Sequence, residues 1–404
     1  LAPFASPSIF LFIGSFFLAE AMRRHGLDQR IALWLLTRRG VTRSPFTLFA
    51  ALGSMTAILS MWMSNVATTA MMLPVATGVL NACPGLRDNR RLQCDLVLLI
   101  AFAASVGGLG TPVGTPPNII AMGFLKKLSG DSITFLDWMK IGVPLVFVLT
   151  AFLLWWLRPK GVVFTDRAVM DADLLARRSA LGPLTPGQLN TAVVFSLAVA
   201  LWMYPGLVEL TTGQRILGVD WMARYLKEET VGLLAGLSLF LLPTNLKNHQ
   251  FTLTWEEAVG IDWGTIFLFA GGLALGTQIF ATGLADAMGR SMSAALGQPS
   301  LWSLVAAGVI LSIILSEATS NTASANVMVP LFIILAGSAS LPQRPVALAV
   351  SLACSFGFML PVSTGPNAMA YSTGLVPLPR MIKAGIALDL VGALAVWLAV
   401  RLLS

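Results

Sequence analysis

Charged side chains are scarce in this chain of 404 residues. Asp, Glu, Lys and Arg make up 11% of it, whereas hydrophobic residues make up 56% and the mean hydropathy is +0.79. An ordinary soluble domain carries about 25% charged residues. The few charges also fall between long hydrophobic segments rather than within them. The sequence therefore argues against a soluble protein and predicts a polytopic membrane protein.

Metal-ligating and reactive side chains are equally few. There are two His (His25, His249) and three Cys (Cys83, Cys94, Cys354), and no spacing among them is typical of a metal site. We therefore interpret them as structural. The net charge of +7 does not predict a nucleic-acid partner, because Lys and Arg gather in short loops, where they orient membrane proteins.

Two stretches of the chain nearly repeat each other. The first reads MWMSNVATTAMMLPV (61–75) and then TPVGTPPN (111–118); the second reads SEATSNTASANVMVPL (316–331) and then LPVSTGPN (360–367). Each copy pairs a Ser-Asn motif with a Pro-rich break that ends in Asn, inside hydrophobic sequence where polar groups are costly. A duplicated polar break of this kind indicates the binding site of a transporter.

The repeat divides the chain into three parts. The matching segments FLFIG (10–14) and FLFAG (267–271) extend it upstream of both Ser-Asn motifs. The predicted parts are a first inverted repeat at 1–157, with a hairpin at 46–83 and a broken helix at 95–127, a cytoplasmic linker with scaffold spans at 158–264, and a second inverted repeat at 265–404, with a hairpin at 300–338 and a broken helix at 345–376. The expected fold is an all-α polytopic membrane protein, an inverted repeat with two opposed re-entrant hairpins and two broken helices.

Basic residues set the expected orientation. The first hairpin lies between cations on both sides, at Arg38, Arg39, Arg43, Arg87, Arg90 and Arg91. Both of its ends should therefore be cytoplasmic, and arms of about 17 residues reach about 25 Å, to the middle of the bilayer. The second hairpin has few flanking cations and should enter from outside.

Counting the crossings extends this orientation to the other basic residues. The count places a further group of cations in the cytoplasm: Arg158, Lys160, Arg167, Arg177, Arg178, Arg380 and Lys383. Lys126 and Lys127 would lie outside, against the positive-inside rule.

The breaks supply chemistry suited to anions and to hard cations. A helix that begins after Ser-Asn presents free N–H groups and partial positive charge, and the amides of Asn65 and Asn321 with the hydroxyl of Thr322 suit carboxylate or sulfate oxygens. Unwound carbonyls and hydroxyls suit Na⁺. The sequence predicts two oxygen cages, one from Ser60, Ser64, Asn65, Gly114 and Thr115, the other from Ser316, Ser320, Asn321, Ser363 and Thr364.

Each of these residues also has an ordinary interpretation. A proline can simply kink a span, and Ser or Asn can simply cap a helix. Glu317 is the one acid inside a motif. It has either a structural hydrogen-bonding role or a role in binding a cation or proton.

These motifs resemble the divalent anion/sodium symporter (DASS) family of dicarboxylate, citrate and sulfate transporters. Its hallmark is two Ser-Asn-Thr motifs at the tips of opposed re-entrant hairpins, each beside a broken helix with a Thr-Pro-Pro-Asn-like turn. The resemblance covers both repeats and implies a scaffold that forms a homodimer and a transport domain that moves as an elevator. It implies substrate contacts at Asn65, Thr115, Asn321, Thr322 and Thr364, and sodium ligands at Ser60, Ser64, Asn65 and Gly114 for one site and at Ser316, Asn321 and Ser363 for the other.

The chain departs from the family pattern at three places. Val66 stands where the family has a threonine, and a lost hydrogen bond to a charged group costs about 1.5–3 kcal/mol. This favours a smaller or asymmetric anion such as sulfate, unless Thr68 or Thr69 compensates. Gly365 stands where a second proline is usual, and the family has more spanning sequence ahead of Leu1, so we expect part of the scaffold and dimer surface to be missing.

The predicted function is secondary active transport that couples Na⁺, at two sites, to uptake of small di- or trivalent anions, either C4-dicarboxylate or citrate. A sulfate symporter, an anion exchanger and an anion channel would use the same residues. No catalysis is expected, because a hydrolase with Ser64 or Ser320 as nucleophile would need a nearby base and neither His lies near them. The expected setting is the cell (inner) membrane, with lipid and a small anion as partners.

Overall fold

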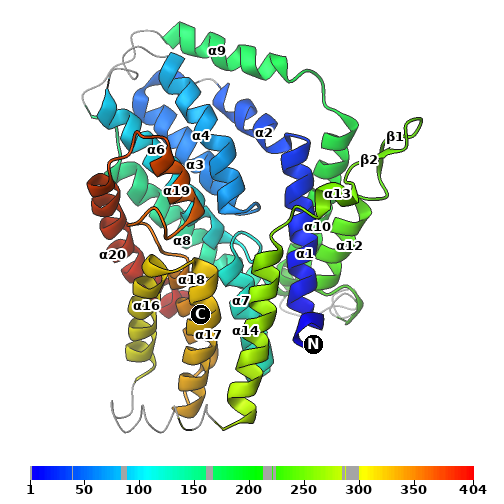
Figure 1. Ribbon diagram of the computed structural model, residues 1–404, viewed down its shortest axis with the longest axis vertical. Helices are drawn as coiled ribbons and strands as arrows, with labels where there is room; N and C mark the ends of the chain where they lie inside the picture. The colour runs from blue at the N-terminus through cyan, green and yellow to red at the C-terminus, as the bar shows by residue number, and fades with distance from the viewer. Residues whose placement is uncertain are drawn as a thin grey trace.

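The computed structural model describes residues 2–38, 40–82, 89–160, 167–212, 221, 224–283, 287 and 300–404. Statements below concern these residues, and Cys83, Arg39, Arg87 and Leu284 lie outside them. The described chain is mostly helical and forms an elongated bundle (Figure 1).

The first half is built of helices, most of which lie in the hydrophobic segments of the sequence. It begins with a short 3-10 helix, η1 (Ala2–Ala5), and continues with α1 (Pro7–Arg24), α2 (Leu27–Leu36), η2 (Val41–Arg43), α3 (Pro45–Ser60), α4 (Asn65–Ala82), α6 (Arg90–Gly107), η3 (Gly108–Gly110), α7 (Pro116–Ser129) and α8 (Phe135–Trp156). Helices α3 and α4 form the predicted first hairpin. Helices α6 and α7, with the irregular segment between them, form the predicted first broken helix.

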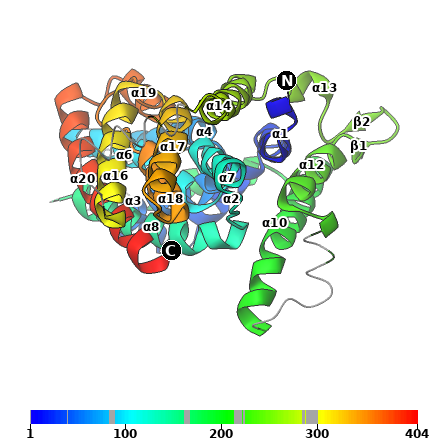
Figure 2. The ribbon, with the colours of Figure 1, turned by 90° about the horizontal axis from the view of Figure 1, so that it is seen from below.

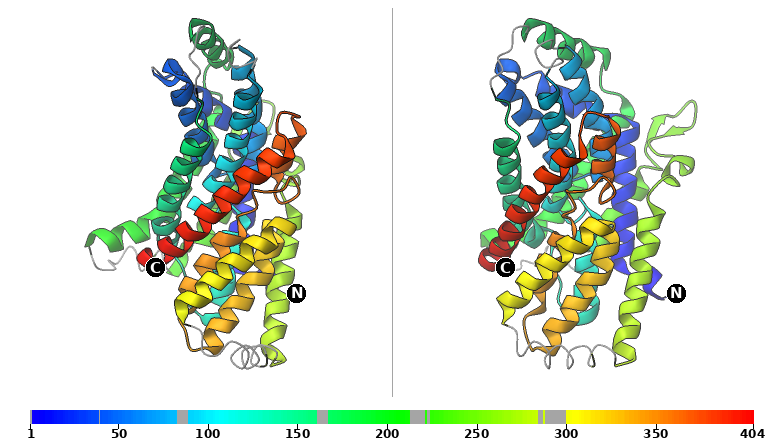
Figure 3. Two further views of the ribbon diagram at one scale, coloured as in Figure 1. Left: turned by 90° about the vertical axis from the view of Figure 1, so that its left-hand side faces the viewer. Right: turned by 60° about the vertical axis from the view of Figure 1, so that its left-hand side comes forward.

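The connecting region and the second half follow. They contain α9 (Arg167–Ala180), α10 (Pro186–Thr212), α12 (Glu228–Ser238), β1 (Pro243–Asn245), β2 (Gln250–Phe251), α13 (Trp255–Ala258), α14 (Trp263–Ala281), α16 (Leu301–Ala318), α17 (Asn321–Ser338), α18 (Gln343–Cys354), α19 (Gly365–Ser372) and α20 (Leu378–Leu403). Helices α16 and α17 are the second hairpin, and α18 and α19 the second broken helix. Figure 3 shows the two hairpins in opposite halves of the molecule, with their turns towards the middle.

Two helices and two strands were not predicted. Helix α2 precedes the predicted first hairpin, and α9 lies in the predicted linker region; both carry many polar residues. The antiparallel strands β1 and β2 correct the all-α expectation; Pro243 and a positive φ at His249 fit a short ribbon rather than a helix. In Figure 1 this ribbon projects from one side, away from the hairpins.

The core of the bundle is α6, which is almost wholly enclosed by other helices. Six helices of the described chain are long and apolar enough to cross a membrane: α6, α8, α10, α16, α17 and α20. Cys94 on α6 and Cys354 on α18 are buried free thiols, in agreement with a structural role. The chain is therefore an integral membrane protein built around a buried hydrophobic helix.

Candidate anion and cation site

The tip of the first hairpin is held by a hydrogen bond between its two arms. The buried Ser60 hydroxyl, at the end of α3, donates to Asn65 Oδ1 at the start of α4 (2.9 Å). The Ser64 hydroxyl caps α4 by accepting from the Ala67 N–H (3.2 Å). A Cβ atom at Gly108 would collide with the Asn65 amide, so only glycine lets that side chain lie against the broken helix.

The first break is shaped by an asparagine that bonds two carbonyls. Asn118 Nδ2 donates to the carbonyl of Gly108 (2.9 Å) and to that of Thr111 (2.7 Å). The Thr111 hydroxyl in turn donates to the carbonyl of Met61 in the hairpin turn. A Cβ atom at Gly114 would lie 2.5 Å from the Gly108 carbonyl oxygen. The break and the hairpin tip therefore form one closely packed unit.

The second hairpin repeats the first geometry. The Ser316 hydroxyl lies 2.8 Å from Asn321 Oδ1 and 2.7 Å from the Cys354 carbonyl oxygen. The Ser320 hydroxyl caps α17 by accepting from the Ala323 N–H (3.2 Å). Asn321 Nδ2 reaches the carbonyl of Ser355 at 3.4 Å. Both Ser-Asn motifs thus do two things: the serine caps a helix, and the asparagine faces the adjacent break.

The second break uses the same asparagine arrangement as the first. Asn367 Nδ2 donates to the carbonyls of Gly357 (2.9 Å) and Leu360 (3.0 Å), at the sequence offsets that Asn118 uses. The Thr364 hydroxyl caps α19 by accepting from the Asn367 N–H (3.3 Å). Thr115, the matching residue, makes no such cap and begins α7 with its side chain buried.

Glu317 organises the second break through hydrogen bonds. Its Oε1 accepts from the N–H groups of Phe358 (2.6 Å) and Met359 (2.8 Å), and its Oε2 accepts from the Ser363 hydroxyl (2.8 Å). Those N–H groups belong to the irregular segment between α18 and α19, where they have no helical partner. Of the two interpretations given from sequence, the structural role is the one these contacts support.

The two halves meet where the hairpin tip of one reaches the break of the other. A Cβ atom at Gly365 would lie 2.6 Å from Val66 Cγ2, so the first tip touches the second break. The Ser351 hydroxyl of α18 donates to the Pro117 carbonyl of α7 (2.7 Å). Asn65 and Thr364 each adjoin the Val66–Gly365 contact in sequence. The first tip and the second break are therefore neighbours, and the helices α7 and α18 are bonded to each other.

Some of the predicted site residues lie together at the two hairpin tips, and others make different contacts. Ser60, Asn65 and Gly114 lie together at the first tip, and Ser316 and Asn321 lie together at the second. Ser363 is bound to Glu317 rather than to Asn321. Ser64 is exposed and serves as a cap, and Thr322 is a half-buried residue in the first turn of α17.

The chemistry of these units fits a hard cation. The Asn118 and Asn367 Oδ1 atoms are buried, and neither has a donor among the described residues. The Ser355 hydroxyl, next to Asn321, is also buried and has no hydrogen-bond partner among the described residues. Buried oxygen atoms without donors are the ligands that Na⁺ takes. The part of the chain that is described contains no cluster of His, Cys, Asp and Glu that would hold a transition metal.

Sequence reasoning named Asn118 and Asn367 only as the ends of the motifs, and did not identify the carbonyls they hold. The missing signal was the spacing: a glycine ten residues ahead of each asparagine, Gly108 and Gly357, provides the first carbonyl. It also missed the contact between Val66 and Gly365. Such a contact joins residues far apart in sequence, so no local pattern could predict it.

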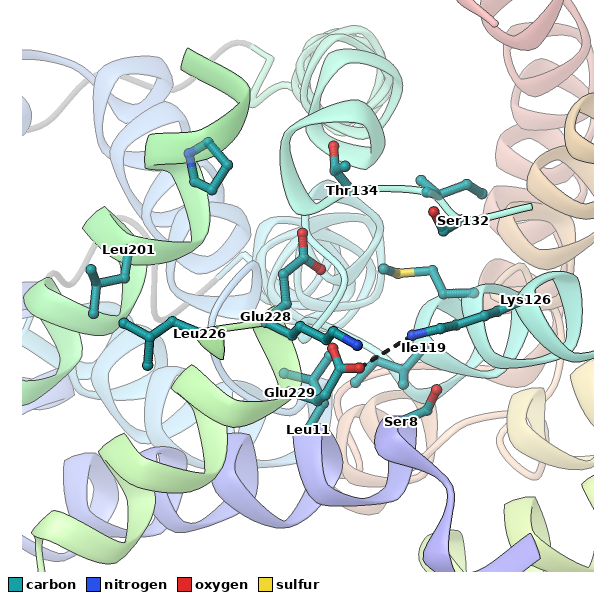
Figure 4. A pocket seen from close by; sticks show the side chains of 14 residues that line it. Ser8, Leu11, Ile119, Lys126, Ser132, Thr134, Leu201, Leu226, Glu228 and Glu229 are labelled. Carbon is teal, nitrogen blue, oxygen red and sulfur yellow. Dashed lines mark hydrogen bonds and ion pairs between the residues drawn. The ribbon is translucent and has the colours of Figure 1, made fainter. Parts of the chain in front are cut away.

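A separate cavity of about 310 Å³ lies where α7 and the start of α8 face α1, α10 and α12 (Figure 4). Lys126 Nζ is 3.2 Å from Glu229 Oε1 across it, and the Phe135 N–H donates to Glu228 Oε1 (2.5 Å). Burial raises the pKa of Glu228 to about 8, against the lowering effect of the Phe135 hydrogen bond. The partner of Lys126 is thus an acid of α12, while its predicted location outside the membrane stays a prediction.

Comparison with known proteins identifies the class. The family described as the sodium:sulfate symporter transmembrane region matches residues 1–403. The chain is 31% identical over 414 residues to the sodium-dependent dicarboxylate transporter SdcS of Staphylococcus saprophyticus, covering 100% of this chain and 77% of that protein. The SdcS of Staphylococcus aureus is 30% identical over 404 residues, covering 97% and 75%.

Two further similarities extend the comparison. An uncharacterized transporter of Haemophilus influenzae is 33% identical over 396 residues, covering 97% of this chain and 80% of that protein. The solved YdaH transporter of Alcanivorax borkumensis, whose topology is described as unusual, has a TM-score of 0.65 at 13% identity and covers 99% of this chain and 86% of that one. That likeness concerns the fold alone. The chain belongs to the divalent anion/sodium symporter family, and it is a transporter and not an enzyme.

Proposed function

We propose that this protein couples Na⁺ to the uptake of small di- or trivalent anions, with C4-dicarboxylate or citrate as the substrate. The observation that carries the proposal is the repeated contact of Ser60 with Asn65 and of Ser316 with Asn321, each beside an asparagine-held break. Family membership and the names of the sodium-dependent dicarboxylate relatives support it.

The anion is proposed to bind between the two tips. Helices α4 and α17 both begin at the tips, so two helix N-termini with partial positive charge would lie beside one small anion. Asn65, Asn321 and the hydroxyls of Thr115, Thr322 and Thr364 would bind its oxygens.

Two Na⁺ sites are proposed, one at each tip. The first would use Ser60, Ser64, Asn65 and Gly114, and the second Ser316, Asn321 and Ser363. Because the motifs themselves contain no Lys or Arg, bound cations would supply the positive charge that a divalent anion needs. Uptake of the anion would then depend on Na⁺.

A larger architecture accompanies this proposal. The hairpins α3–α4 and α16–α17 would be re-entrant, would enter the cell membrane from opposite sides and would belong to inverted repeats at 1–157 and 265–404, joined by the region 158–264. The opposite placement of the hairpins in Figures 1 and 3 supports this. A homodimer and elevator movement of a transport domain against a scaffold are part of the same proposal.

Uptake into proteoliposomes tests the function. Labelled succinate, citrate and sulfate are supplied with and without an inward Na⁺ gradient. We expect uptake of succinate or citrate that needs the gradient. Sulfate uptake with the gradient would make the protein a sulfate symporter, uptake driven only by an internal anion would make it an exchanger, and conductance without a gradient would make it a channel.

Substitution of the tip asparagines tests the site. We expect Asn65→Ala and Asn321→Ala each to reduce uptake to background while the purified protein stays monodisperse, because each removes both an oxygen ligand and a donor. Asn248→Ala, in an exposed turn, is the matched control and should transport normally. Near-normal uptake by both tip variants would refute the site assignment.

A further inference from the structure

Five basic side chains from three separate segments surround one pocket of about 210 Å³, where α6 and α20 begin and α8 ends. They are Arg91 of α6, Arg158 and Lys160 after α8, and Arg380 and Lys383 of α20. Among the described residues, Asp95 is the acid that faces them, 2.6 Å from Arg380 and 3.7 Å from Arg91. The pocket therefore carries a strong net positive charge.

The N-termini of two helices add partial positive charge beside the pocket. Helices α6 and α20 both begin beside the pocket, and neither has an acidic residue in its first turn. Basic residues near a helix N-terminus oppose the helix dipole and cost stability. Arg91 and Arg380 occupy such positions, so an external anion would relieve an unfavourable arrangement within the protein.

Two tryptophans form the wall of the pocket and point to its ligand. The indole N–H of Trp156 is buried and has no acceptor among the described residues. Trp155 is exposed and lies beneath the Arg158 guanidinium, 5.8 Å from ring centroid to Cζ. A buried donor without an acceptor among the described residues is suited to an oxygen atom of a bound ligand. Exposed tryptophan is also the residue that marks the boundary between lipid and water.

A separate apolar groove lies between α8 and α20, further along the two helices whose ends adjoin the basic pocket. It has a volume of about 360 Å³ and is lined by Pro144 and Val148 of α8 and by Leu394, Leu398 and Leu403 of α20, among others. At 1.5 Å per residue, the step from Trp155 to Val148 places the near end of the groove about 10 Å from the pocket. A charged pocket above a hydrophobic groove matches a phosphate headgroup with an acyl chain.

We propose that α6, α8 and α20 form a binding site for an anionic phospholipid of the cytoplasmic leaflet, with the phosphate in the basic pocket and an acyl chain in the groove. Free phosphate would use only the pocket, and a second copy of this chain would use only the groove. The positive-inside rule, applied to Arg158, Lys160, Arg380 and Lys383, places this end in the leaflet that carries the anionic lipids.

Native mass spectrometry of the full chain in detergent tests the proposal. The probes are phosphatidylglycerol, phosphatidylcholine and inorganic phosphate. We expect tight binding of phosphatidylglycerol only. The double variant Arg158→Gln/Lys383→Gln should weaken that binding by about 30-fold, since each basic residue near a membrane surface contributes about 1 kcal/mol. The matched control, Arg178→Gln/Lys247→Gln, removes the same charge elsewhere and should bind like the parent.

A groove variant separates the possible ligands. Leu394→Trp fills the groove and should also weaken phosphatidylglycerol binding. Equal losses in the charge variant and its control would overturn the proposal. So would inorganic phosphate that binds as tightly as the lipid and is unaffected by Leu394→Trp, or a change from dimer to monomer in that variant, which would make the groove an interface between copies of the chain.

Discussion

The two breaks share a backbone and differ in side chains. In each, a serine hydroxyl bonds an asparagine at the hairpin tip, at 2.9 Å in the first and 2.8 Å in the second. In each, a second asparagine holds two carbonyls at the same offsets. The residue after the serine is Met61 in the first half and Glu317 in the second. The repeated pattern therefore fixes the shape of the site, and the residues outside the pattern set its charge.

In both breaks, side chains bond backbone groups in or beside the irregular segment, but the two breaks use different side chains. In the second break, Glu317 accepts from two backbone N–H groups and a hydroxyl. In the first, neutral groups act instead: the Thr111 hydroxyl bonds the Met61 carbonyl, and Trp138 Nε1 donates to the Leu109 carbonyl (3.0 Å). A backbone that leaves the helix needs partners. The difference implies that the two proposed cation sites have different electrostatic surroundings.

The largest effect is expected when Glu317 is replaced by methionine, the residue at the equivalent position of the first half. Glu317→Met removes three acceptor contacts and should lower the free energy of unfolding by at least about 3 kcal/mol, since each buried donor left unpaired costs about 1–3 kcal/mol. Met61→Leu, the matched change in the first half, should cost less than about 1.5 kcal/mol. Thermal unfolding of the purified variants measures both. Equal midpoints would mean that Glu317 does not hold the second break.

The next largest effect concerns two glycines that pack on the breaks, and the loss of stability should be the same in both halves. Gly142 of α8 and Gly385 of α20 each pack on a break, where a Cβ atom would lie 2.5 Å from the Leu109 carbonyl oxygen and 2.6 Å from the Met359 nitrogen. We expect Gly142→Ala and Gly385→Ala each to destabilise by about 1–3 kcal/mol through overpacking. Gly271→Ala, where a Cβ atom has open space, is the control. A loss confined to one variant would show that the two breaks are not supported alike.

A smaller effect concerns selectivity. Val66 is half exposed and touches Gly365, so the two departures from the family pattern are in contact with each other. We expect Val66→Thr to restore a hydroxyl and raise the preference for succinate over sulfate by about tenfold, within the range of a hydrogen bond to a charged group. Competition uptake assays measure the preference. An unchanged ratio would remove Val66 from the selectivity argument.

The smallest effect should appear as pH changes, at the contact between the connecting region and the start of α8. Glu228 has a pKa raised to about 8 and bonds the start of α8. A carboxyl whose folded pKa exceeds its unfolded value makes stability fall as pH rises from its ordinary pKa towards 8. We expect Glu228→Gln to flatten that fall, as measured by unfolding midpoints from pH 5 to 9. A parallel pH profile for the parent and the variant would contradict the assignment.

Much of this arrangement was predictable because the membrane restricts what a chain can do. The ends of the hydrophobic segments at 46–83 and 300–338 fall within a residue or two of the helix pairs α3–α4 and α16–α17, and Asn65 and Asn321 begin the second helix of each pair. What escaped prediction depends on pairs distant in sequence. The role of Glu317 requires Phe358 and Met359, and the Lys126–Glu229 pair crosses between helices. Periodicity and local spacing carry no information about such partners.

One hydrogen bond between the two halves bears on how bound ions and substrate would move. The Ser351 hydroxyl, from the second half, holds the Pro117 carbonyl of the first at 2.7 Å. This hydrogen bond ties α18 to α7, the two helices that adjoin the irregular segments, so it favours movement of both segments together. In the proposed transport cycle, the bound ions and the anion would then cross the membrane together.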